Sequence, residues 1–300
     1  MRATALVRTL GIASLCVATP CAAADNIEDA IRLAPADAWI LDYADHSCSL
    51  NREFSDGQRS VMLKLEQRFP GDLYQIAFGS RNLTLTGEDP TVWLLPDSNG
   101  SEIPIGGRGE RDGIEAITIV RSLRRTADLE SVTGWDAAMR EKREGEIEGV
   151  AVTNAFSSPF LLQTGSLSAP LQAMEHCLVD LMNGLGLDGP EQLKLTRPAS
   201  RMNYERWVRR VVGEGAPRNL VVRGVNAIVP INLIIDEHGQ VTHCSGRAFR
   251  EFPRLVDDTC ASVSKHAQYE PAMDSRGNPI ASHDSFSVVY RVDGGRDWAE

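Results

Sequence analysis

The clearest hydrophobic pattern of the chain lies in its last third. Apolar side chains occupy alternate positions there: Val229, Ile231, Leu233 and Ile235. A period of two is typical of a strand with one buried face. Residues 236–239 supply turn chemistry and an extended run starts at residue 240, so we predict a β-hairpin over residues 229–244.

After the hairpin, the spacing of the apolar positions changes to three and four residues. These positions are Phe252, Leu255, Val256, Cys260 and Val263. The spacing predicts a helix with Pro253 in its first turn and with Asp257 and Asp258 on the solvated side. Residues 269–271 end the helix and residues 274–277 form a turn. A final strand alternates at Phe286, Val288, Tyr290 and Val292, which gives the order β-β-α-β.

The first half of the chain shows shorter alternating runs. The predicted strands are residues 38–43, 60–69, 73–78, 83–85, 91–95 and 115–121. Turn-rich segments separate them at residues 70–72, 87–90, 96–100 and 106–113. This spacing predicts an all-β meander. A polar helix is expected at residues 135–144.

A second, amphipathic helix should close this half. Ser168 can cap it, Pro170 suits its first turn and Gly184 ends it. Its apolar stripe consists of Leu171, Met174, Leu178 and Leu181.

These elements predict an α+β protein of two domains. Residues 25–188 would form a β-rich domain of unknown function with the second helix packed on its sheet. Residues 189–215 would be a linker with a short helix, residues 216–293 a small antiparallel β-β-α-β domain, and residues 294–300 a tail. A chain of 300 residues with 42% hydrophobic residues is long enough for two cores.

Residues 1–24 have the composition of a secretory signal peptide. Two arginines precede an apolar run, and three alanines precede Asp25. We therefore predict cleavage before Asp25 and a periplasmic location. A retained membrane anchor is an alternative, although the apolar run is short for a span and is interrupted by Pro20. Lipidation at Cys21 is a further alternative.

The formal net charge is −10, which argues against a nucleic-acid partner because phosphate binding needs clustered Lys and Arg. One local exception is the basic run at residues 206–210. Trp207 and Val211 lie on one side of this run, so we interpret it as the solvated face of a helix.

Signal removal would leave four cysteines: Cys48, Cys177, Cys244 and Cys260. In an exported protein, four cysteines indicate two disulfides. Three pairings are possible, and domain locality favours Cys48 with Cys177 and Cys244 with Cys260. A metal site is the alternative, because one module holds His238, His243, Cys244, Cys260 and His266. However, these residues lack zinc-ligand spacing.

Three segments of the first half have a passing likeness to catalytic or binding loops. Residues 164–170 are similar to a subtilase serine loop, residues 106–109 to a phosphate loop and residues 97–102 to a calcium loop. Each lacks residues that its chemistry needs, and capping or turn formation explains each one. His46 has Asp45, Ser47 and Ser49 nearby, but adjacent strand residues point to opposite faces. We predict no catalytic residue, no cofactor and no metal ligand.

The last third resembles the C-terminal domain of the TonB family of bacterial energy transducers. The resemblance covers residues 216–292 and rests on the hairpin INLIIDEHGQVTHC and on Tyr-Glu-Pro-Ala at residues 269–272. It also rests on Pro217, which stands ten residues before Ala227, where the family places Tyr-Pro and Glu-Gly pairs. Here the pairs are Ala216-Pro217 and Asn226-Ala227, so the Tyr, Glu and Gly are absent.

The resemblance implies a periplasmic module that offers a sheet edge to an extended peptide. The expected partner is an outer-membrane receptor or another envelope protein, and main-chain hydrogen bonds would supply the affinity. The expected contact strip on the final strand consists of Ser285, Ser287, Val289 and Arg291, with residues 216–223 beside it. A homodimer through the same edge is a further expectation.

Energy transduction would need a retained membrane helix and a long proline-rich spacer. A folded domain and a short linker stand in place of that spacer, so we predict a protein-binding relative and not a complete transducer. The alternative is a secreted enzyme with its site in the first domain and the TonB-like module as docking unit. A third hypothesis is an envelope structural or assembly protein. Titratable side chains that converge in a first-domain pocket would favour the enzyme.

Overall fold

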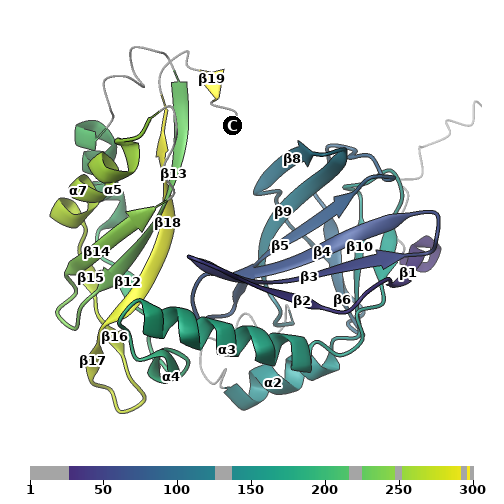
Figure 1. Cartoon of the computed structure of the whole chain (residues 1–300), viewed down its shortest axis with the longest axis horizontal. Helices are drawn as coiled ribbons and strands as arrows, with labels where there is room; N and C mark the ends of the chain where they lie inside the picture. Colours follow the sequence, from purple (N-terminus) through teal and green to yellow (C-terminus); the bar gives the residue numbers. More distant parts are fainter. Residues whose placement is uncertain (1–26, 126–136, 216–224, 247–251, 292–295, 298–300) are drawn as a thin grey trace, which may run out of the picture.

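The computed structural model describes residues 27–125, 137–215, 225–246, 252–291 and 296–297. The predicted signal peptide, residues 216–224 and Val292 lie outside these ranges. The described chain packs around two main hydrophobic cores, one on each side of the molecule in Figure 1. We call the part up to the end of α3 (Ser168–Gly184) the first domain, and the part from β12 (Ser200–Arg201) onward the second domain. The mixture of sheets and separate helices confirms the α+β class.

The first domain is built on one large sheet. Its strands are β1 (Ile31–Pro35), β2 (Ile40–Ala44), β3 (Ser47–Ser55), β4 (Ser60–Gln67), β5 (Leu73–Ser80), β6 (Thr91–Leu95), β7 (Ser101–Glu102), β8 (Gly107–Arg111), β9 (Ile114–Ser122), β10 (Gly149–Thr153) and β11 (Phe160–Leu162). A short 3-10 helix, η1 (Ile27–Asp29), precedes them.

The strand order is β7-β6-β10-β11-β1-β3-β4-β5-β9-β8, with β2 paired to β3. From β2 to β5 the strands follow one another as in the predicted meander, but β5 then pairs with β9, because β6 and β7 lie at the far end of the sheet. The other half is different, because β10 and β11 insert between β6 and β1, and β1 runs parallel to β11. The prediction of a meander throughout the domain was therefore wrong. A parallel pair needs a long crossover, and no local pattern announces one.

Local predictions in this domain also needed correction. The segment 106–113, predicted as a loop, contains β8, whose five residues are all exposed and which is held by backbone pairing with β9. The predicted strand 83–85 forms only one isolated bridge, between Leu85 and Phe156.

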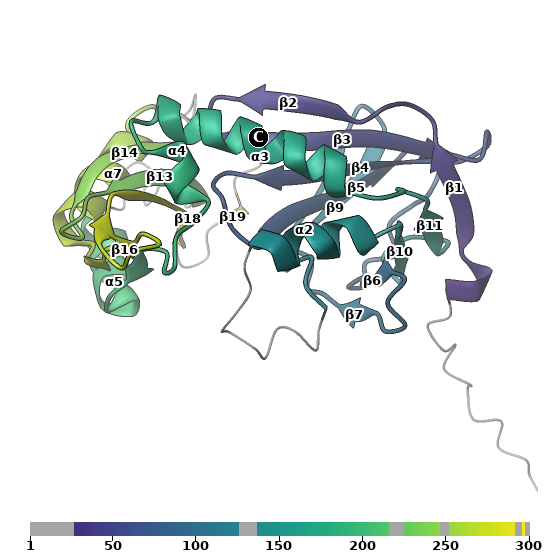
Figure 2. The same ribbon diagram turned by 90° about the horizontal axis from the view of Figure 1, so that it is seen from below.

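Two helices pack on the first domain, α2 (Ala137–Glu146) and α3. Helix α2 extends two residues beyond the predicted end at residue 144, and Trp135 lies outside the described residues. Helix α3 has the predicted bounds and lies along β3 toward the second domain (Figure 2). Leu167, not Ser168, is its N-cap, and no side chain caps the helix.

Both predicted disulfides are formed in the structure. Cys48 of β3 is bonded to Cys177 of α3, which fastens the helix to the sheet. Cys244 is bonded to Cys260, which links the second-domain hairpin to its helix. Disulfides are typical of proteins that fold outside the reducing cytosol.

The second domain consists of a small sheet covered on one face by two helices. Its sheet contains β13 (Val225–Ile235), β14 (Val241–Gly246), β18 (Ser282–Tyr290) and β19 (Arg296–Asp297), in the order β14-β13-β18 with β19 beside the start of β13. The helices are α5 (Tyr204–Gly215) and α7 (Leu255–His266). Figure 1 shows both helices on the side of this sheet that faces away from the first domain.

The alternation of β13 places Val229, Ile231, Leu233 and Ile235 in the core, each at most 1% exposed. Gly239 closes the β13–β14 turn with a positive φ of 79°. A Cβ there would lie 2.2 Å from the carbonyl oxygen of Tyr269, so glycine is required. The predicted order of hairpin, helix and final strand agrees with the structure.

The element ends in this domain differ from the predictions. Helix α7 begins at Leu255, so Phe252 and Pro253 precede it and Pro253 is not in its first turn. Strand β18 begins four residues before Phe286. Short strands lie between α7 and β18: β15 (Tyr269–Glu270), β16 (Ala272–Met273) and β17 (Pro279–Ile280).

The segment between the two cores is packed and partly helical. It contains α4 (Gly189–Gln192), capped by the Asp188 side chain, which accepts from the Glu191 N–H. Gly189 is needed where α4 turns onto α3, because a Cβ would lie 2.4 Å from the Val179 carbonyl oxygen. On the other side, the buried Gln192 amide donates to the Ala281 carbonyl oxygen at 2.9 Å.

A further contact between the domains involves His283 of β18. Its ring lies 5.4 Å from the ring of Phe69, which follows β4 in the first domain. Burial lowers the pKa of His283 to about 4. This contact joins the start of β18 to the first domain, and Gln192 joins the residue before β18 to the segment between the cores.

Candidate functional site

The strongest candidate binding surface is the outer edge of β18. Within the described residues, β18 pairs along its whole length with β13 and has no strand on its other side. A strand with one unpaired side presents N–H and C=O groups that can accept another strand. This edge is where the sequence placed the contact strip.

The register shows which residues of β18 direct their backbone groups outward. Ser287 lies opposite Pro230 of β13, and proline has no N–H to donate. The pair must therefore be a non-hydrogen-bonded one, in which both residues turn their N–H and C=O groups away from each other. Ser285, Ser287 and Val289 share this orientation because the strand alternates.

Arg201 covers the beginning of this edge. Its Nη2 donates to the Ser285 carbonyl oxygen at 3.1 Å, which independently shows that this carbonyl points outward. The same guanidinium donates to both carboxylate oxygens of Asp284, at 2.7 and 2.8 Å. It also lies over the ring of Phe286, 4.5 Å from the centroid.

We call the contacts of Arg201 with Asp284, Ser285 and Phe286 the Arg201 clasp, and Tyr269 also takes part in it. Tyr269 donates its hydroxyl to Asp284 at 2.7 Å. Burial, and then the neighbouring Asp284 carboxylate, raise the pKa of Tyr269. Burial disfavours the charged form of Arg201, but the hydrogen bond and the charge of Asp284, together with Tyr269, outweigh burial and raise the pKa of Arg201. Arg201 therefore stays charged, and the open part of the edge begins at Ser287.

The predicted strip residues occupy different environments along this edge. Ser285 is half-buried and its carbonyl is bonded to Arg201, whereas Ser287, Val289 and Arg291 are exposed. Val289 lies opposite Ile228 on the open face, and the two side chains are 41% and 62% exposed. They form an apolar pair at the open part of the edge. The expected neighbouring residues 216–223 lie outside the described ranges.

Sequence reasoning missed Arg201. It stands three residues before α5 without any periodic pattern, and its partner Asp284 is 83 residues away. Asp284 itself was a possible signal. It is the acidic residue of β18, among mostly apolar and small residues, and a half-buried carboxylate needs a partner.

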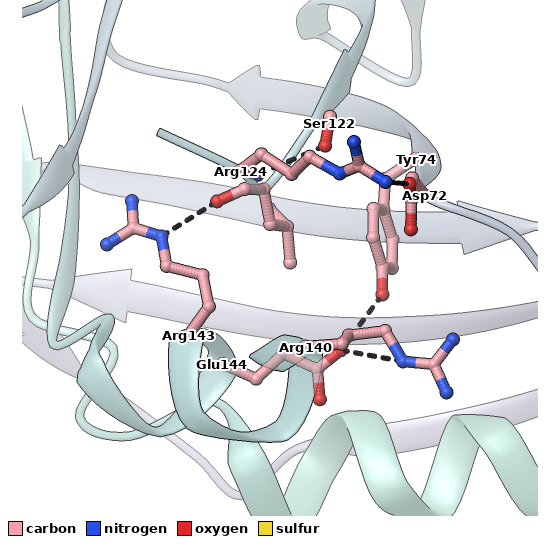
Figure 3. Close-up of a pocket in the computed structure, with 8 residues that line it drawn as sticks. Asp72, Tyr74, Ser122, Arg124, Arg140, Arg143 and Glu144 are labelled. Atoms are coloured by element: carbon pink, nitrogen blue, oxygen red, sulfur yellow. Dashed lines mark hydrogen bonds and ion pairs between the residues drawn. The ribbon is translucent and has the colours of Figure 1, made fainter. Parts of the chain in front are cut away.

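Titratable side chains also converge in the first domain, which is the observation that would favour an enzyme. They surround a pocket between β5, the end of β9 and α2 (Figure 3). The pocket is lined by Asp72, Tyr74, Ser122, Leu123, Arg124, Arg140, Arg143 and Glu144. The Tyr74 hydroxyl donates to Glu144 at 3.4 Å, and Arg140 lies 3.9 Å from the same carboxylate.

The size of this pocket limits what it can do. Its volume is about 10 Å³, which is about enough for one water molecule. Its charged groups already have partners: Arg124 is paired with Asp72, and Arg143 donates to the Leu123 carbonyl oxygen at 2.9 Å. The arrangement therefore anchors α2 to the sheet and offers no room for a substrate in this conformation.

Burial changes the protonation of the two central groups. It raises the pKa of Glu144 to about 7, against the opposing effect of Arg140. Burial, followed by the charge of Glu144, also raises the pKa of Tyr74. A carboxyl group with a pKa near neutrality is the property that an acid–base catalyst needs, but it also arises in structural networks.

The raised pKa of Glu144 predicts a pH-dependent stability. The folded pKa lies above the ordinary value of 4.5, so the folded state binds the proton more tightly, and stability falls as the pH rises from about 4.5 to above 7. The variant Glu144→Gln keeps an acceptor for Tyr74. We expect it to lose about 1 to 2 kcal/mol less of its free energy of unfolding between pH 5 and pH 8 than the wild type does. Urea unfolding at pH 5 and pH 8 measures it.

Glu110→Gln on the exposed strand β8 is the matched control for this prediction. It should change the stability equally at both pH values. The same pH dependence in wild type and Glu144→Gln would show that Glu144 is ionised in the folded protein at pH 5.

The other candidate motifs have structural roles. In segment 164–170, the Ser166 hydroxyl accepts the Ser168 N–H at 3.3 Å at the start of α3. Among the described residues, no group of three or more His, Cys, Asp or Glu could hold a metal ion. Cys244 and Cys260 of the alternative metal set form a disulfide instead. Within the same ranges, no helix has the length and apolar character needed to cross a bilayer.

Comparisons with known proteins do not assign a family. No protein-family model matches the chain, and neither curated proteins nor solved structures gave a significant match. The functional argument therefore rests on the site itself.

Proposed function

We propose that the second domain binds an extended segment of another envelope protein along the open edge of β18. The observation that supports this is the one-sided pairing of β18, with the backbone groups of Ser287 and Val289 turned away from β13. An added strand would pair with these groups, as in other recognition modes that extend a sheet. The TonB-like resemblance of residues 216–292 supports an outer-membrane receptor as the partner.

The chemistry of the edge favours a short peptide with an apolar side chain. Main-chain hydrogen bonds from Ser287 and Val289 would supply affinity that is independent of sequence. The exposed pair Ile228 and Val289 would give specificity, because alternate side chains of an added strand project toward the same face. Arg201 would set the register, because it already occupies the Ser285 carbonyl.

Location follows from the same proposal. The two disulfides fit an oxidising compartment. A cleaved signal peptide at residues 1–24 would deliver the chain to the periplasm, where the partner would be met. The protein would act as a binding module in that compartment and not as a complete energy transducer.

The first test is loss of binding in Val289→Pro. Proline removes an outward-facing N–H while leaving the ladder with β13 intact, because Val289 is not hydrogen-bonded to β13. We expect binding to an outer-membrane receptor, recovered from solubilised membranes, to weaken at least about tenfold. Pull-down from outer and inner membranes followed by titration of the recovered partner measures the change.

Val289→Ile is the matched control, because it keeps the backbone N–H and an apolar, β-branched side chain. It should bind like the wild type, and circular dichroism should show the same fold for all three proteins. Equal recovery by wild type and Val289→Pro would contradict edge pairing.

The alternative is an enzyme with its site in the first domain. Its best candidates are Tyr74 and Glu144, whose pocket holds about one water molecule. A wider cavity of about 300 Å³ lies beside the Cys48–Cys177 disulfide. Its titratable lining consists of Tyr43, Asp45 and Asp180, and in the described part of the chain no hydrogen bond joins any two of them as nucleophile and base. We therefore favour the binding function.

A further inference from the structure

A cavity of about 170 Å³ lies where the start of α5 meets the end of α7. It is lined by Asn203, Arg206, Trp207, Arg210, His266 and Gln268. The titratable side chains in this lining are two arginines and a histidine, so no acidic group contributes to its wall. This is unusual in a protein with 41 acidic and 31 basic residues.

The two arginines belong to the basic run that the sequence showed on α5. Arg206 and Arg210 are four residues apart, so they project from the same face with Cβ atoms about 6 Å apart. Arg209, on a different face, is paired with Glu205 at 3.2 Å. Among the described residues, neither Arg206 nor Arg210 has a carboxylate within ion-pair distance.

The nearest part of α7 does not neutralise these arginines. Glu214 accepts from Lys265 at 3.0 Å and lies 2.7 Å from Nε2 of His266. This carboxylate is therefore committed to α7 and does not line the cavity. The positive charge of Arg206 and Arg210 remains available to a ligand.

Trp207, another residue that lines the cavity, carries a buried hydrogen-bond donor without a partner among the described residues. Trp207 is 3% exposed, and its indole N–H has no acceptor in the described part of the chain. Buried donors of this kind normally have a partner. Because Trp207 lines the cavity, its indole N–H provides a local spectroscopic probe.

We propose that this cavity is a phosphate-binding site in which Arg206 and Arg210 grip the ligand oxygens. Guanidinium groups suit phosphate because their planar N–H donors match its oxygens in pairs. Two arginine charges are balanced by a phosphate group, which carries about −1.5 to −2 near neutral pH, whereas one carboxylate balances only one of them. The Asn203 and Gln268 amides add neutral donors at the rim.

The test uses the full mature chain with ¹⁵N-labelled tryptophan. Trp207→Phe identifies the indole N–H signal of Trp207, and inorganic phosphate is then titrated at constant ionic strength. We expect a saturable shift of this signal in the wild type, and at least a tenfold weaker response in the Arg206→Gln/Arg210→Gln variant. Sodium chloride at matched ionic strength should give no saturable shift.

Arg209→Gln is the matched control, because it removes one positive charge from the same helix outside the cavity. It should bind phosphate like the wild type. Equal weakening by Arg209→Gln would show a diffuse charge effect and overturn the site. Phosphate binding that is unchanged in the double variant would also overturn the site.

A second experiment distinguishes the source of the phosphate group. The same variants are tested by flotation with vesicles that contain phosphatidic acid, with phosphatidylcholine vesicles as reference. Binding of inorganic phosphate without flotation assigns a soluble ligand, and flotation that requires Arg206 and Arg210 assigns a lipid headgroup. Absence of both kinds of arginine-dependent binding overturns the proposal.

Discussion

Replacing Cys48 and Cys177 by alanine is expected to lower the free energy of unfolding of the first domain by about 5 kcal/mol. The bond joins residues separated by 129 positions, so it restricts most of the unfolded first domain. Both cysteines are 1% exposed, and the bond is the covalent link between α3 and β3. Its removal should therefore also loosen the packing of α3.

The second disulfide supplies the comparison. Cys244 and Cys260 are separated by only 16 positions, and the loop-entropy relation gives about 3 kcal/mol for this bond, about 2 kcal/mol less than for the first. Guanidinium unfolding of each double-alanine variant, followed by tryptophan fluorescence and circular dichroism, measures the two losses. A larger loss from Cys244→Ala/Cys260→Ala would contradict the loop-length argument.

The second large effect is expected at Asp97. This carboxylate accepts from Nη1 of Arg143 at 3.0 Å and from Nε of Arg125 at 3.2 Å. The Arg143 side chain is only 3% exposed, so Asp97→Ala would leave a buried guanidinium without its counter-charge. We expect a loss of about 3 kcal/mol in the free energy of unfolding.

Neighbouring charges make this loss more severe. Burial, and then the charge of Arg143, lower the pKa of Arg121 to about 10, while Asp97 acts in the opposite direction. Removing Asp97 therefore leaves two guanidinium groups that repel each other. Urea unfolding of Asp97→Ala at pH 7 measures the destabilisation.

A double variant separates the charge effect from loss of packing. Asp97→Ala/Arg143→Met replaces the unpaired charge with an apolar side chain, and it should recover part of the loss. Glu205→Ala breaks an exposed ion pair with Arg209 and should change stability by less than about 0.5 kcal/mol. No recovery in the double variant would assign the effect to packing around the β6–β7 turn.

The sequence predicted those parts of the fold in which one local pattern decides the structure. The alternation in β13 and the stripe of α3 were sufficient, because each element buries a single face. The disulfide pairings followed from domain locality, since each pair lies within one domain. The edge position of β18 followed from its place as the last long strand.

Other elements carry no such pattern. All residues of β10 and β11 are buried, so neither strand alternates and both were missed. Strand β8 is polar and exposed throughout, so only its partner β9 defines it. The Tyr74–Glu144 contact joins residues 70 positions apart, and such a contact depends on the tertiary fold.

The Arg201 clasp has a consequence for solubility. An unprotected strand of nine residues would be a template for aggregation, because identical chains could join edge to edge into a continuous sheet. Arg201 places a charged side chain over the start of that template, and His283 is covered by Phe69. The stretch that remains open is long enough for a short guest strand but too short for extensive stacking of copies. Replacement of Arg201 should therefore cause aggregation first at high protein concentration, where it is detected as an increase in light scattering.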